Sequence, residues 1–188
     1  MSKVELSVAP WMYPMPVAVV GTVVDGTINY NTIAYCGVIG HRPPLLYVCM
    51  SKHHHTTRGI QQSSAFSVNI PSSELIDKVD YAGVVSGESC DKSQLFKSFI
   101  GVTGTPLAKE CAVNFDCRLE KTLDFGGGEL VFIGKIEKLY AEESVLTGGR
   151  LDVQKITPLC LDNARNTYYG VGKDLAPAYR VGCKELNR

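Results

Sequence analysis

The chain has 188 residues, 45% of them hydrophobic, and its 19 basic residues balance its 19 acidic ones. That length and composition predict a single domain, residues 1–188, with one sizeable core. A balanced charge gives no general attraction to nucleic acid or to an anionic membrane, so we expect neither as a partner.

The N-terminal region and the cysteines indicate the compartment. No long apolar segment precedes a small-residue cleavage site, and no apolar run reaches about 18 residues. The seven cysteines are an odd number, and none forms a CxxC pair, which is atypical of disulfide frameworks and zinc ribbons. We therefore expect a cytoplasmic protein whose thiols are mostly reduced.

The first half of the chain is dominated by strand patterns. Short apolar runs rich in β-branched residues and bounded by Gly, Pro and Asn predict strands. Asp25 and Gly26 separate the first two runs and predict a tight hairpin, because both residues tolerate positive φ. These predicted strands span 17–24, 27–34, 45–50 and 65–70.

Two helices and four later strands complete the pattern. Residues 55–64 predict a helix of two to three turns with Ser63 and Ser64 past its end, and residues 72–86 predict a second helix capped at Ser72 or Ser73. Because hairpins occur early and late, we expect a mainly antiparallel sheet closed into a barrel, a mainly β fold with peripheral α-helices. The later predicted strands span 112–123, 130–141, 159–162 and 168–171, the first two joined by a DFGGG turn.

The stretch from Asn31 to Ile60 carries most of the polar chemistry, and three interpretations compete: a metal site, an anion site or no site. The run His53-His54-His55, with His41 nearby, suggests a metal. However, adjacent residues point in different directions, and neither an HxxxH nor a carboxylate spacing supports them. We predict no metal, and a solvated loop with one functional histidine.

Cys36, between Tyr35 and Gly37, is a candidate nucleophile. A reactive thiolate needs a helix N-terminus or a neighbouring base, and the sequence places neither there. We therefore favour a small packed residue beside a bend.

The segment SKHHHTTRG is better interpreted as an anion cradle. Hydroxyls of Ser51, Thr56 and Thr57, the ammonium of Lys52 and the free N–H groups of a helix start could converge on one phosphate. The alternative is an ordinary polar loop. Lys92 could add charge if its loop folds back.

Two common nucleotide motifs are absent. No GxGxxG follows a strand and opens a helix, and no GxxxxGK[ST] occurs. The cluster FGGGE is more typical of a turn than of a phosphate loop, although its Glu129 could face a pocket.

Five segments occur in an order and spacing that resemble a known family. They are YPMPVAVVGT, NYNTIAYCGVIGHRPPLLYVCM, AFSVNIPS, DYAGVVSGESCDK and TYYGVG. From about Tyr13 to Gly172 the chain resembles the flavin reductase-like family with the FMN-binding split-barrel fold, in particular its flavoredoxin branch.

The resemblance implies a Greek-key split barrel that forms a homodimer, with one FMN per subunit in a groove at the dimer interface. By position it implies a hydroxyl and lysine cradle for the phosphate and ribityl chain, and backbone N–H groups at the ring edge. The implied cofactor-binding residues are Asn29, Thr32, Ile33, Ala34, Tyr35, Cys36, Met50, Ser51, Lys52, Thr56, Thr57, Lys92 and Glu129.

Three of these positions carry individual expectations. Lys92 matches a family lysine near the flavin, and Tyr35 stands where relatives often have tryptophan. Glu129 stands where the flavoredoxin branch can have histidine. A carboxylate near the ring would disfavour an anionic reduced flavin, which an imidazolium would stabilise.

The function that the resemblance implies is an FMN-dependent oxidoreductase that moves electrons from NAD(P)H or a protein donor to flavin and onward. No catalytic side chain is required, because the flavin itself accepts hydride. One alternative is a non-catalytic FMN electron carrier. Another is a metal or thiol redox protein built on Cys36, the histidines, Cys111 and Cys117.

Overall fold

The computed structural model describes residues 2–182. Its helices are α1 His55–Ser63, α2 Ile76–Val84 and α3 Val153–Ile156, with short 3-10 turns at Ser73–Leu75 and Glu143–Val145. Its strands are β1 Met15–Pro16, β2 Ala18–Val24, β3 Thr27–Ile33, β4 Cys36–His41, β5 Pro44–Ser51, β6 Ala65–Ile70, β7 Ser98–Ile100, β8 Pro106–Ala108, β9 Val113–Asp124, β10 Glu129–Ala141, β11 Leu146–Thr147, β12 Arg150–Leu151, β13 Leu159–Asp162 and β14 Thr167–Gly170.

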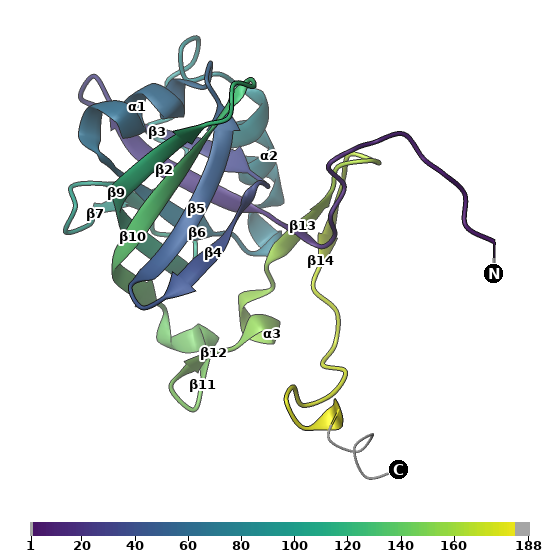
Figure 1. Ribbon diagram of the computed structural model, residues 1–188. Coiled ribbons are helices and arrows are strands. Elements are labelled where there is room, and N and C mark those ends of the chain that lie inside the picture. Colours follow the sequence, from purple (N-terminus) through teal and green to yellow (C-terminus); the bar gives the residue numbers. More distant parts are fainter. Residues whose placement is uncertain (1, 183–188) are drawn as a thin grey trace.

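Seven strands form one antiparallel sheet in the order β3-β2-β6-β9-β10-β5-β4, which curls into a barrel (Figure 1). The two edge strands, β3 and β4, are consecutive in the chain and are joined only by Ala34 and Tyr35. Within residues 2–182 no ladder pairs β3 with β4 or β5. The barrel is therefore split along this line, and the predicted mainly β split barrel is confirmed.

The first hairpin forms as predicted. Asp25 and Gly26 adopt φ of 48° and 82°, and β2 pairs with β3 from Ala18 opposite Ile33 to Val24 opposite Thr27. The left-handed turn matches the right-handed twist of the two strands. This register fixes which polar residues of β3 face inward.

The barrel interior is filled by apolar side chains from alternate strand positions, among them Val20, Val48, Phe66 and Phe132, none of which is exposed. Helix α1 closes one end by packing on β2. A Cβ on Gly59 would lie 2.5 Å from Cγ2 of Thr22, so only glycine allows the helix to approach this closely.

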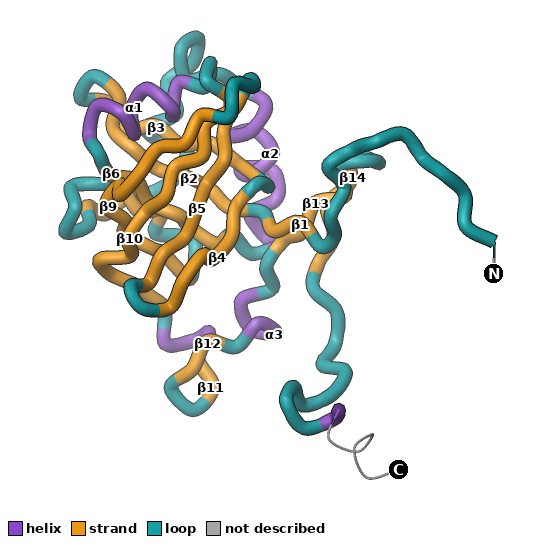
Figure 2. The backbone as a smooth tube through the Cα atoms, in the orientation of Figure 1, coloured by secondary structure: helices purple, strands orange, loops and turns teal. Residues whose placement is uncertain are grey.

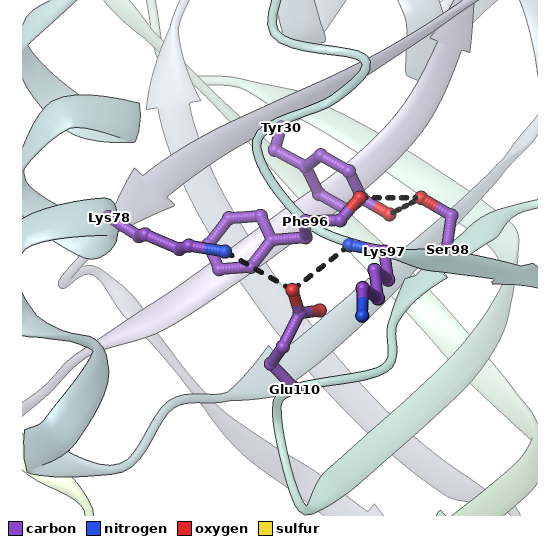
Figure 3. Close-up of polar contacts among 6 residues, drawn as sticks. All are labelled: Tyr30, Lys78, Phe96, Lys97, Ser98 and Glu110. Atoms are coloured by element: carbon purple, nitrogen blue, oxygen red, sulfur yellow. Dashed lines mark hydrogen bonds and ion pairs between the residues drawn. The ribbon is translucent and has the colours of Figure 1, made fainter.

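A second cluster lies between α2, β3 and the segment that leads into β7 (Figure 3). The rings of Tyr30 and Phe96 meet edge to face with centroids 5.2 Å apart. The Tyr30 hydroxyl lies 2.7 Å from Oγ of Ser98, and burial raises the pKa of Tyr30 to about 12. The phenol is therefore a permanent, neutral hydrogen-bonding group of the core.

Glu110 ties α2 to the same cluster (Figure 3). Its Oε1 accepts from Nζ of Lys78 at 3.2 Å and from the backbone N–H of Lys97 at 3.1 Å. Burial by itself would raise the pKa of Glu110, but these hydrogen bonds and the lysine charge together lower it. The carboxylate therefore stays ionised and holds three segments together.

A small sheet of β1, β13 and β14 lies beside the barrel, and the described segments before β1 and after β14 extend away from it (Figure 2). Met15 and Pro16 pair with Leu161 and Cys160, so the N-terminal segment is attached to the barrel through the last hairpin. The segment up to residue 13 and the segment after β14 form no described strand.

The structure corrects several sequence predictions. The expected bend at Cys36 is the first residue of β4, a strand that the sequence did not predict because its glycines interrupt the apolar pattern. Ser72 is the N-cap of the second helical segment, but its side chain makes no capping hydrogen bond. The two-residue strands, the β7–β8 pair and α3 were also missed, being too short for a periodic signal.

Within residues 2–182, none of the helices has both the length and the apolar character needed to span a bilayer.

Candidate functional site

A pocket of about 270 Å³ opens where the barrel is split between β3 and β5. We call it the split pocket. Seven of the thirteen predicted site residues line it: Thr32, Ile33, Ala34, Tyr35, Met50, Ser51 and Glu129. The other lining residues are Met15, Cys49, His54, Leu161 and Asn163.

The strand ends determine which side chains reach the split pocket. Glu129 begins β10 directly opposite Ser51, the last residue of β5. On the other side Thr32 belongs to edge strand β3, whose outer backbone groups have no strand partner among the described residues. The Thr32 hydroxyl donates to the carbonyl of Val79 at 2.6 Å and so positions α2 beside the split. The pocket is therefore bordered by unpaired backbone of the kind that binds ligand edges.

Asn31 and His54 join the two sides of the split. The Asn31 amide lies 3.1 Å from Nδ1 of His54 and 3.9 Å from Sδ of Met50. Burial, and then the charge of Lys92, lower the pKa of His54. The imidazole is therefore neutral at physiological pH, and its Nδ1 can accept from the amide.

The turn that leads into α1 is built by the hydroxyls predicted to hold an anion. Thr57 donates its hydroxyl proton to the carbonyl of Ser51 at 2.7 Å, and Thr56 accepts from Nδ2 of Asn29 at 2.7 Å. Ser51 Oγ accepts from the N–H of His53 at 3.2 Å. Thr57 thus serves the turn itself, whereas Thr56 still has a proton to donate.

The N-terminus of α1 has no internal compensation for its helix dipole. Its N-cap, His54, makes no side-chain capping hydrogen bond, and no acidic residue lies in the first turn. The first N–H groups of a helix have no partner within the helix, and the dipole there favours an anion. This end of α1 is suited to bind a phosphate.

Lys92 is buried, with 4% of its surface exposed, beside the same turn. Its Nζ donates to the carbonyls of Ala82 and Val85 at 3.0 and 2.9 Å, at the end of α2. Burial lowers the pKa of Lys92 to about 8. With two of three ammonium protons used, one remains for a ligand in the hollow of about 150 Å³ that Lys92 shares with Asn31 and His54.

The remaining predicted residues lie around this centre. Asn29 and Lys92 line a polar hollow of about 420 Å³ on the far side of His55. Cys36 lines a larger hollow beside the N-terminal segment. Lys52 lines none of these hollows, and its ammonium pairs with Asp124 at 2.8 Å.

The histidine run separates into three different environments. His53 is exposed, His54 contacts Asn31, and His55 has a buried Nδ1 with no hydrogen-bond partner. Across the described chain, no three His, Cys, Asp or Glu side chains gather as metal ligands would. The buried Nδ1 of His55 is therefore a polar atom to which a ligand or a water molecule could form a hydrogen bond.

The thiols are packed rather than activated. The six cysteines that the structure describes are free. Burial raises the pKa of Cys36 to about 11 and that of Cys111 to about 12, and it also raises that of Cys117. A protonated thiol is a poor nucleophile, so a packing role for Cys36 fits better than a reactive one.

Several lining residues had no individual assignment from the sequence. Asn31 does have a signal, because Asn29 and Asn31 alternate with Tyr30 and so lie on one face of a strand that also carries buried apolar residues. Leu161 and Asn163 have none, since the β13–β14 hairpin brings them to the split from 130 residues further along the chain.

The chain is similar to known flavoproteins along most of its length. A flavoredoxin from Methanosarcina acetivorans is 38% identical with a TM-score of 0.95, over 98% of this chain and 100% of that one. The flavoredoxin of Desulfovibrio vulgaris (Miyazaki F) is 31% identical with a TM-score of 0.90, over 96% and 100%.

Curated sequences give the same relationship at greater distance. The FMN reductase (NADH) RutF of Bradyrhizobium diazoefficiens is 24% identical over 135 residues, 66% of this chain and 73% of that one. A relative from Aeropyrum pernix is longer, and the match spans 63% of its length. Residues 12–167 match the model of the flavin reductase like domain. The chain therefore belongs to the flavin reductase-like family.

Proposed function

We propose that the protein is an FMN-dependent oxidoreductase that passes electrons from NAD(P)H, or from a protein donor, through bound FMN to an acceptor. The observation that carries the proposal is the split pocket, where seven predicted flavin-site residues from three strands and the β3–β4 connection meet beside an uncapped helix N-terminus. The chain's membership of the flavin reductase-like family and the FMN reductase among its relatives also support the proposal.

The residues present fit FMN at both ends. The split pocket offers an apolar wall of Ile33, Ala34 and Met50 and the free edge of β3, suited to a flat ring with polar edges. The hollow next to it, which shares His54, offers the N–H groups of α1 and the Lys92 ammonium, suited to a phosphate. The buried Nδ1 of His55 gives a further polar atom nearby.

When bound, FMN would supply the redox chemistry by taking up and releasing hydride. The chain's own residues bind and orient the cofactor. The N-terminus of α1 and Lys92 would bind the negatively charged phosphate of FMN. At the ring end, Glu129 would place a carboxylate beside the flavin. No side chain is needed as nucleophile or acid, which agrees with the protonated thiols.

FMN titration of the purified protein tests the cofactor. We expect stoichiometric binding and quenched flavin fluorescence. Mixing the loaded protein with NADH or NADPH without oxygen then tests the activity, since rapid bleaching of the flavin absorbance is expected. Reduction by dithionite but not by either nicotinamide over many minutes would instead identify an electron carrier that a partner protein reduces.

We also propose that the protein is a homodimer. The split pocket is open, and apolar side chains of the extended N-terminal segment, including Val4, Leu6 and Val8, lie on the surface with 71% or more exposed. Several exposed apolar side chains on one extended segment favour an interface, and an isologous contact would cover them in both copies. Light scattering should report about twice 20.5 kDa. A monomer that retains FMN tightly would contradict this proposal.

A further inference from the structure

A second cavity of about 570 Å³ lies between the N-terminal segment and the outer side of β4, β5 and β10. We call it the Trp11 pocket. Residues 9–12 and 14–16 form one wall, and Tyr35, Cys36, Tyr47 and Val131 lie on the other. Its volume is in the range of small-molecule sites, about 300–1,000 Å³.

The lining of the Trp11 pocket is apolar and aromatic. Trp11, Tyr35 and Tyr47 contribute rings, and none of the residues that line the cavity carries a charge. Aromatic walls favour a flat ring through stacking. Uncharged walls disfavour phosphates and carboxylates, because the ligand charge would lose its hydration without gaining a partner. The phosphate-rich nicotinamide dinucleotides are therefore poor candidates for this cavity.

The Trp11 pocket adjoins the split pocket. The two share four lining residues: Met15, Ala34, Tyr35 and Cys49. A molecule in one cavity therefore lies against the same short segment as a molecule in the other. The split pocket, by contrast, also has Ser51, His54 and Glu129 in its wall. The neighbouring cavities thus differ in the chemistry they accept.

We propose that the Trp11 pocket binds the electron acceptor, a small uncharged planar ring compound of the quinone class. This inference rests on the proposed function, which places FMN in the split pocket. A quinone becomes a hydroquinone by taking up two electrons and two protons. Reduced FMN, returning to its oxidised form, supplies both electrons and one or both protons, and water supplies any remaining proton.

Trp11 is the only tryptophan of the chain, so its fluorescence reports on this cavity. The probe is 1,4-naphthoquinone, corrected for absorption with free N-acetyltryptophanamide. We expect saturable quenching in the FMN-loaded protein. The anionic 1,4-naphthoquinone-2-sulfonate should bind at least tenfold more weakly, because it has the same ring with a charge that the walls do not compensate.

Val131→Phe fills the Trp11 pocket from β10, at a position that does not line the split pocket. We expect it to weaken naphthoquinone binding at least tenfold and to slow reoxidation of the reduced protein by naphthoquinone, with FMN affinity unchanged. The control Leu139→Phe, at an exposed position of the same strand, should change neither. Circular dichroism and FMN titration verify that both variants are folded.

Any of the following results would overturn the proposal: quenching that rises linearly without saturation, equal binding of the sulfonate, or equal binding by Val131→Phe. Binding that weakens as protein concentration rises would also overturn it, since a second copy of the chain would then occupy the cavity. FMN titration separates these failures from failure of the proposed function, because it measures binding at the flavin site and not in the Trp11 pocket.

Discussion

Two regions of the molecule use buried polar side chains in opposite ways. On β6, Asn69 is fully buried and all its hydrogen bonds are made. Its amide donates to Val19 and Ser67, and its oxygen accepts from Ala108 and Asn114. Two strands away, at the split, the polar groups are only partly used. The difference distinguishes a polar group that holds the fold from one that awaits a ligand.

The unused hydrogen-bonding capacity is concentrated around α1. Lys92 has one ammonium proton to spare, His55 has a buried ring nitrogen without a partner, and the helix N-terminus lacks a cap. Buried polar groups normally find partners. Glu110 in the other region also leaves one oxygen unpaired, but its second oxygen accepts twice. We interpret the concentration at α1 as the signature of the binding site.

A substitution of Asp116, which lies in the structural region, should have the largest effect on stability. Its buried carboxylate accepts from the hydroxyls of Thr103 and Thr105 and from the N–H of Thr103. Asp116→Ala should lower the free energy of unfolding by about 2–4 kcal/mol, since it leaves several donors without an acceptor. Urea denaturation measures this.

FMN affinity per folded molecule should remain unchanged in Asp116→Ala, because Asp116 lines neither pocket. Asp174→Ala, in the exposed C-terminal segment, is the matched control and should leave stability unchanged. A selective loss of FMN binding in Asp116→Ala would break the distinction between the two regions.

Lys92 tests the site. Lys92→Met should weaken FMN binding about ten- to a hundredfold, equivalent to 1.5–3 kcal/mol for one charge-assisted hydrogen bond. If the Lys92 ammonium also lies near the ring, the midpoint potential should fall, because the reduced flavin loses a nearby cation. Fluorescence titration and a dye-coupled potential measure the two effects. Binding and potential equal to those of the parent would remove Lys92 from the site.

The lowered pKa of Lys92 gives the same prediction a pH dependence. Affinity should fall as pH rises through about 8, and FMN binding near that pH should take up protons, because the phosphate favours the charged lysine. Without FMN, stability should rise between pH 8 and 10.5, where the unfolded chain binds the proton more tightly. Calorimetry in buffers of different ionisation enthalpy detects the uptake. Lys92→Arg, which stays charged, should abolish it.

Substitutions of Lys52 and of its partner Asp124 should change FMN affinity in opposite directions. Their ion pair lies at 2.8 Å and is partly exposed, so its own contribution to stability is small, about 0–1 kcal/mol. If Lys52 serves the phosphate, Lys52→Gln should weaken FMN binding about tenfold and make it less sensitive to salt. Asp124→Asn should strengthen binding, because it releases the ammonium. Changes of the same sign in both variants would exclude this role.

Glu129 carries the smallest expected effect. Its carboxylate faces the split pocket and opposes negative charge on a reduced flavin. Glu129→Gln should raise the midpoint potential by roughly 10–30 mV, where 30 mV corresponds to about 1.4 kcal/mol for two electrons. Glu137→Gln, further along β10, is the control and should leave the potential unchanged. A fall in the potential of Glu129→Gln would reverse the assigned role.

Local sequence patterns specify most of the regular structure. The β6 and β13 strands have the predicted bounds, and α1 ends one residue after its predicted end, because apolar period, β-branching and turn residues act locally. The five family segments also identified most of the wall of the split pocket. Strand β4 escaped prediction because its glycines hide the alternation.

Which polar groups are free for a ligand depends on how distant parts of the chain pack together. Thr56 and Thr57 looked equivalent in the sequence, yet only Thr57 donates its hydroxyl proton to a backbone carbonyl of the turn. Lys52 forms an ion pair with a residue 72 positions away. The Trp11 pocket likewise exists only because β1 pairs with β13 and draws the N-terminal segment against the barrel. Partnering and enclosure depend on contacts between distant parts of the chain, so no local pattern can specify them.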